Sequence, residues 1–125
     1  MLEMHGASQL LTSFNDSIPS FIFSGIVTSD AVRTKHPEQV KAFVRGMLKA
    51  FQFIKEHEAE ARALMPKYCG VEMEVASKSA LREYSGDGRE SEENIDIQQE
   101  LMIRYGFLKE KVPVEKFVDY SFLVP

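Results

Sequence analysis

The chain has 125 residues, of which 44% are hydrophobic and 27% charged, a composition typical of a folded globular protein rather than a disordered one. Its formal net charge of -4 and its pI of about 5.4 are those of an acidic protein. The chain therefore lacks the excess of basic residues that nucleic-acid binding requires, and we expect no nucleic-acid partner. Cys69 is the only cysteine, which excludes a disulfide within the chain and leaves the redox compartment open.

The N-terminal segment has no basic n-region and no continuous apolar h-region, so we expect no export signal and, from the chain as written, a cytoplasmic location. The first strong structural signal is the run of residues 20–28, which is rich in aromatic and β-branched residues. This pattern predicts a buried β-strand. The run is too short to cross a bilayer, so we expect no membrane insertion. A weaker second strand is predicted near residues 9–14.

A long helix is predicted to follow. Ser29 and Asp30 offer a cap for a short turn of helix, and Pro37 marks the first position of the long one, with Glu38 in its first turn. Apolar residues then recur at steps of three and four: Val40, Phe43, Val44, Met47, Leu48, Phe51 and Ile54. This spacing predicts a helix that faces the core with Phe43, Met47 and Phe51.

Shorter helices are predicted in the rest of the chain. One covers residues 58–65, where Pro66 either ends or kinks it, and the apolar pattern from Val71 to Tyr84 favours another of about thirteen residues. Residues 85–89 form a loop by composition. Ser91 caps a further helix that ends near Gly106, and Pro113 opens a last short one. The fold class predicted is therefore α/β and helix-rich, with one or two strands and about five helices.

Residues 18–29, 36–46 and 114–123 together resemble, in order and spacing, the C-terminal part of a family of ABC-transporter solute-binding proteins. This family takes up nitrate, sulfonates, taurine and thiamine precursors. The resemblance covers nearly the whole chain from about Gln9. It implies a partial lobe of the type II periplasmic-binding-protein fold, in which two α/β lobes hold a solute in the cleft between them.

The resemblance also implies an organisation. Residues 1–125 form a single partial domain, in which residues 9–28 are a crossing and strand segment and residues 29–125 a helical portion. The first lobe and most of the second are missing from the chain. In the full-length family the partners are the small-molecule solute and the ABC permease, and the location is periplasmic or extracytoplasmic. Asn15, Asp16 and Ser17 correspond to the border of the cleft, where they would contact a solute, although the same residues also form an ordinary turn.

We expect no enzymatic activity, no cofactor and no metal. One branch of the same superfamily makes the thiamine pyrimidine, but a cysteine-rich motif marks that branch, and Cys69 stands alone here. His5, His36 and His57 lack metal-ligand spacing.

Two functions stay open. The chain is either the C-terminal portion of an importer's solute-binding component, for a small anionic or heterocyclic solute, or a remnant that acts as a homo-oligomeric structural module without a solute. Because the apolar run 20–28 has at most one weak partner strand, we expect a homo-oligomer in which residues 18–28 form the interface.

Overall fold

A computed structural model describes residues 3–123. Within this range the chain forms α-helices and short 3₁₀-helices. The α-helices are α1 (Phe14–Ser17), α2 (Asp30–Lys35), α3 (Pro37–Glu56), α4 (Glu58–Cys69), α5 (Met73–Lys78) and α6 (Glu92–Arg104), and the 3₁₀-helices are η1 (Val114–Lys116) and η2 (Tyr120–Phe122). The prediction of a helix-rich fold is confirmed.

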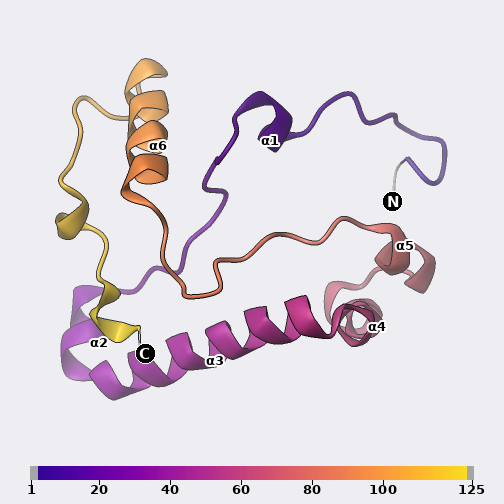
Figure 1. Cartoon of the computed structure of the whole chain (residues 1–125), viewed down its shortest axis with the longest axis horizontal. Helices are drawn as coiled ribbons and strands as arrows, with labels where there is room; N and C mark the ends of the chain where they lie inside the picture. Colours follow the sequence, from indigo (N-terminus) through magenta and orange to yellow (C-terminus); the bar gives the residue numbers. More distant parts are fainter. Residues whose placement is uncertain (1–2, 124–125) are drawn as a thin grey trace.

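The helix α3 runs along one side of the molecule, and most other elements lie beside it or at its ends (Figure 1). At its N-terminal end it packs against α2, and at its C-terminal end against α4, which in turn packs against α5. The chain then runs back along α3 as an extended segment, residues 79–90, before it turns away into α6. After α6 the chain returns, and η2 packs on α3. The last described residues therefore lie beside the helix that organises the fold.

The predicted helix boundaries are largely confirmed, because local capping determines them. The Ser29 hydroxyl accepts a hydrogen bond from the Val32 amide at the start of α2, and the Ser91 hydroxyl accepts one from the Asn94 amide at the start of α6. Pro37 occupies the first turn of α3. Gly70 and Gly106 follow α4 and α6 in left-handed conformations, with φ of 65° and 78°.

Two helices differ in extent from the sequence patterns. Of the two alternatives at Pro66, an end or a kink, the end is excluded, because α4 continues to Cys69 with Pro66 inside it. The predicted helix of about thirteen residues, from Val71 to Tyr84, is only the six-residue α5, and the chain is extended after it. Tyr84 is not part of this helix and instead stacks on Phe51 of α3.

No strand is found among residues 3–123, so the α/β prediction with one or two strands is not confirmed. Residues 21–29 and residues 8–13 form neither helix nor strand, and neither segment has a ladder partner. A β-strand exists only when its amide and carbonyl groups pair with a neighbour.

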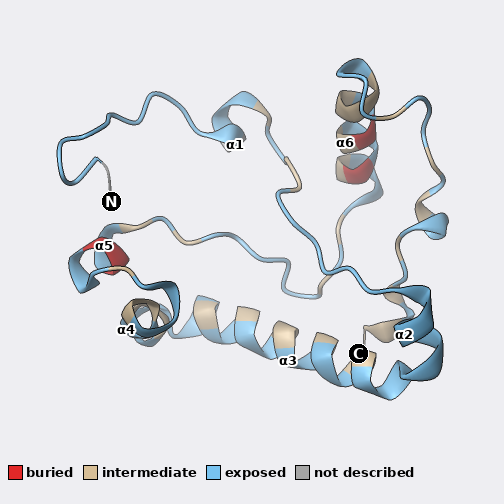
Figure 2. Ribbon diagram, turned by 180° about the vertical axis from the view of Figure 1, so that it is seen from behind, coloured by how far each residue is buried: buried red, intermediate tan, exposed pale blue. Residues whose placement is uncertain are grey.

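The core is small, and this corrects the prediction for α3. The fully buried residues among those described are Val75 and Ala76 of α5 and Ile95 and Gln99 of α6. The apolar stripe of α3 is only half-buried, and Phe43 is 56% exposed. Figure 2 shows exposed ribbon over most of the molecule, with the buried positions confined to two separate helices. Within one chain, nothing covers the full width of the α3 stripe.

Candidate functional site

The predicted solute-contacting residues lie on α1, a single turn of helix. Ser13 and Asp16 form a capping box there: the Ser13 amide donates to Asp16 Oδ2 over 3.0 Å, and the Asp16 amide donates to Ser13 Oγ over 3.2 Å. The Ser13 hydroxyl also donates to Asp16 Oδ2 over 2.7 Å. These bonds explain why a short polar sequence forms a helical turn at this point.

The capping box occupies the groups that a solute would need. Hydrogen bonds from the Ser13 side chain and backbone lower the pKa of Asp16 below its ordinary value of 3.8, so this carboxylate is charged at neutral pH. Ser17 Oγ lies 3.4 Å from Thr12 Oγ1. Both Asp16 and Ser17 are exposed, and the side chain of Asn15 lies outside the described part of the structure. The structure brings the described members together in a turn rather than in a cleft.

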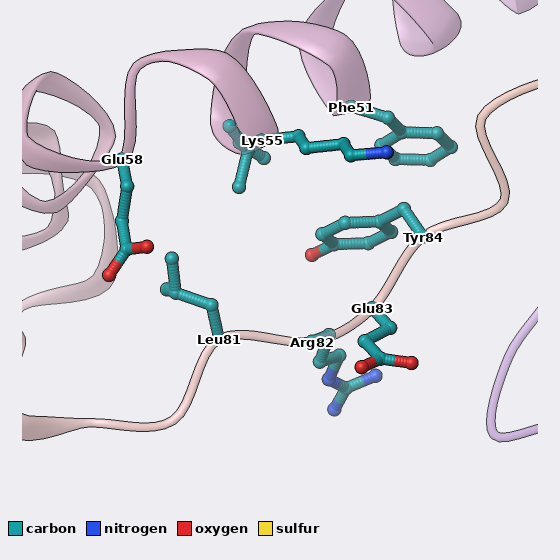
Figure 3. A pocket seen from close by; sticks show the side chains of 8 residues that line it. Phe51, Lys55, Glu58, Leu81, Arg82, Glu83 and Tyr84 are labelled. Carbon is teal, nitrogen blue, oxygen red and sulfur yellow. The ribbon is translucent and has the colours of Figure 1, made fainter.

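A hollow of about 420 Å³ lies between the C-terminal half of α3 and the extended segment 81–84 (Figure 3). One side of it is formed by the stacked pair of Phe51 and Tyr84, whose ring centroids are 4.4 Å apart with an angle of 8° between the planes. The residues that line it are Phe51, Ile54, Lys55, Glu58, Leu81, Arg82, Glu83 and Tyr84. This stack is what holds the extended segment onto α3.

The hollow does not have the character of a solute site. Its charged side chains are two cations, Lys55 and Arg82, and two anions, Glu58 and Glu83, so it has no net preference for an anion or a cation. The Arg82 guanidinium is already engaged, 3.9 Å from the centroid of the Phe23 ring. We interpret the hollow as the open flank of the Phe51–Tyr84 contact.

A cluster of contacts joins the loop 85–90 to the C-terminal segment. The Glu90 amide donates to Tyr120 Oη over 3.1 Å, and the Tyr120 hydroxyl donates to the Glu90 carbonyl over 3.2 Å. The Arg89 guanidinium lies 4.8 Å from the centroid of the Tyr120 ring. Arg33 of α2 pairs with Asp119 over 3.0 Å. These contacts fix the end of the chain against α2 and α3.

Sequence reasoning missed two side chains that organise the fold. Arg62 of α4 is held by Glu58, 2.8 Å away, and its Nη1 donates to the carbonyls of Ala76 and Ser79 at the end of α5. Gln99 of α6 is buried, and its Oε1 accepts a hydrogen bond from the Val112 amide over 2.7 Å. The spacing of Glu58 and Arg62 signals a helical ion pair, but the carbonyl partners are not visible in the sequence.

The described residues contain no group of three or more histidine, cysteine or acidic side chains placed to hold a metal ion. His57 has one carboxylate neighbour, Glu60, 3.1 Å from its Nδ1. Among the helices of residues 3–123, none combines the length and the apolar character needed to span a membrane.

Comparison with known proteins found no matching family model, no matching curated protein and no matching solved structure.

Proposed function

We propose that this chain is the C-terminal portion of the solute-binding component of an ABC importer for a small anionic or heterocyclic solute. The observation that carries the proposal is an apolar segment without a ladder partner, residues 21–29, followed by a series of helices. Residues 21–29 form no helix and no ladder in the described structure, and α2 to α6 follow them along the chain. In a two-lobed fold this run becomes a sheet strand once the remaining strands are supplied.

In this assignment the protein is not an enzyme and acts outside the cytoplasm, where it delivers its solute to the importer's permease. Asn15, Asp16 and Ser17 border the cleft, and α1 presents them there. A bound solute is buried between two walls, and this chain supplies one of them. The small core supports such a role, because α3 has an apolar stripe that needs a further layer.

The second candidate is a homo-oligomeric structural module without a solute. The observation that favours it is the same unpaired segment, because an exposed apolar edge also pairs with a second copy. The two candidates differ in what completes the edge: the other lobe of a solute-binding protein, or another molecule of this chain.

A chimeric protein tests the first candidate. In a taurine-binding protein of the resembled family, the C-terminal portion from the second crossing onward is replaced by residues 9–125 of this chain. We expect a folded monomer that retains taurine binding within about tenfold, because most solute contacts belong to the donor part. Calorimetric titration with taurine measures the affinity.

The matched control is the same chimera with residues 9–28 in reversed order, which preserves composition and length. This control should lose taurine binding. A chimera that does not fold, a folded chimera without taurine affinity, or a control that binds as well as the chimera would each contradict the proposed function.

A further inference from the structure

The segment 21–28 combines free backbone groups with exposed apolar side chains. Among the described residues, the amides and carbonyls of residues 22–28 make no hydrogen bond. Val27 is 93% exposed, Phe23 62% and Ile26 52%. The run contains no charged residue and no proline, the devices by which proteins usually protect a free edge from pairing. Phe23 is covered by the Arg82 guanidinium, and Phe21 stacks on Phe14 with ring centroids 5.4 Å apart.

The exposed area of the whole chain indicates that a large surface is left to be covered. The chain exposes 10131 Å², whereas a compact monomer of this mass exposes about 6,800 Å². The excess is about 3,300 Å² for one chain and about 6,700 Å² for two. Interfaces of obligate homodimers bury roughly 2,000–5,000 Å² or more in total, so an interface of that class covers about a third to three quarters of the excess of two chains.

We propose that, in the absence of another lobe, two copies of this chain form a symmetric dimer by pairing their segments 21–28 edge to edge. Pairing satisfies the amides and carbonyls that point toward the other copy, those of every second residue in each segment. Apolar residues occur at both odd and even positions of the segment, Phe21, Phe23 and Val27 on one side and Ile22 and Ile26 on the other. Both faces of the two-stranded ribbon therefore need cover, and the half-buried stripe of each α3 supplies an apolar surface for it.

The dimer does not depend on solute binding. Because the other lobe of a solute-binding protein would occupy the same edge, dimer formation and completion of the two-lobed fold exclude each other. A chain that dimerises but fails in the taurine chimera overturns the proposed function alone, and a monomeric chain whose chimera binds taurine overturns the dimer alone.

The test compares two substitutions at equally exposed apolar positions. Val27→Lys places a charge in the pairing segment, and Leu11→Lys places the same charge outside it; Val27 is 93% and Leu11 90% exposed, so neither change removes packing within one chain. Light scattering at micromolar concentration should give twice the 14.2 kDa chain mass for the unchanged chain and for Leu11→Lys. For Val27→Lys it should give the mass of one chain.

Hydrogen exchange of the backbone amides of residues 22–28 is the second measurement. In the unchanged chain the amides that point toward the other copy, about half of them, should exchange at least about tenfold more slowly than in Val27→Lys, because pairing protects them. A folded monomer, polydisperse aggregates, a dimer that persists in Val27→Lys, or a dimer whose residues 22–28 exchange rapidly would each overturn the proposal.

Discussion

At the scale of single residues, polar side chains hydrogen-bond segments that are distant in the sequence. Tyr120 joins the C-terminal segment to Glu90, and Arg62 joins α4 to the end of α5. Gln99 joins α6 to Val112. With few fully buried apolar residues, such bonds contribute a larger share of the free energy of folding than they do in a protein with a large core.

Tyr120→Phe removes the hydroxyl that bonds both the amide and the carbonyl of Glu90. We expect a loss of about 0.5–1.5 kcal/mol in the free energy of unfolding, the usual contribution of a hydrogen bond. Urea denaturation followed by circular dichroism measures it. The control is Tyr68→Phe, since Tyr68 is 71% exposed. Equal stability of the two variants would show that the Tyr120 hydroxyl contributes nothing.

Asp119 makes stability depend on pH. Hydrogen bonds from Ser121, and after them the Arg33 guanidinium, lower the pKa of Asp119 below its ordinary value of 3.8. Because the pKa is lower in the folded state, the stabilisation is fully present above the ordinary pKa and is lost as the pH falls through the folded value. Asp119→Asn should therefore be less stable than the unchanged chain at pH 7, and the difference should disappear under strongly acidic conditions.

Unfolding midpoints from pH 2 to pH 7 test this dependence, with Asp30→Asn as the comparison. Asp30 also pairs with Arg33, but its side chain is 92% exposed, against 37% for Asp119. The effect of Asp30→Asn should be the smaller one, because solvent screens exposed pairs. A difference between Asp119→Asn and the unchanged chain that stays constant down to pH 2 would contradict this account.

Gly88 holds the loop 85–90 against the C-terminal segment. Its φ is 75°, and a Cβ added there would lie 2.8 Å from Leu123 Cδ2 and 3.0 Å from Leu48 Cδ2. Gly88→Ala should destabilise the fold by about 1–3 kcal/mol through backbone strain and crowding. Gly86→Ala is the matched control, because a Cβ at Gly86 meets open space. Thermal melting of both variants decides the matter, and equal midpoints would refute the tight packing at Gly88.

At the scale of elements, the sequence predicts what local chemistry determines. The serine caps, Pro37 and the glycines after α4 and α6 act within a few residues of where they stand, so most helix boundaries could be predicted. The end of α5 could not, because Tyr84 leaves the helical repeat to stack on Phe51, 33 positions earlier in the chain. Strand pairing likewise depends on a distant partner, which explains why the run 20–28 predicts an extended segment but not its sheet.

The candidate site was predictable only as a turn. Ser13 and Asp16 stand three residues apart, and this spacing is itself the signature of a capping box. The solute contacts assigned to Asn15, Asp16 and Ser17 come from the family resemblance and stay a prediction.

Ser91 is the cap of α6 and offers a test of its stability. The Ser91 hydroxyl accepts a hydrogen bond from the Asn94 amide over 3.1 Å. Ser91→Ala should lower the free energy of unfolding by about 1 kcal/mol, whereas Ser91→Asp should preserve it, because aspartate caps a helix as well as serine does. Chemical denaturation compares the two variants. A Ser91→Asp protein as unstable as Ser91→Ala would argue against the cap.

At the scale of the whole molecule, the chain is open. Its secondary structure is well capped, but α3 keeps a half-buried apolar stripe and residues 22–28 keep free backbone groups. Both features leave apolar side chains and backbone groups exposed to solvent. The proposed function and the proposed dimer cover them in different ways, and both imply that one chain by itself cannot enclose a small molecule between two walls.

Calorimetric titration of the unmodified chain with taurine, nitrate and the thiamine pyrimidine tests this implication most directly. We predict no binding tighter than about millimolar for any of them, because under the proposed function this chain supplies one wall of the cleft, and a solute against one wall would stay largely hydrated. A complex of micromolar or tighter affinity would contradict the account, since it would require a complete site within residues 1–125.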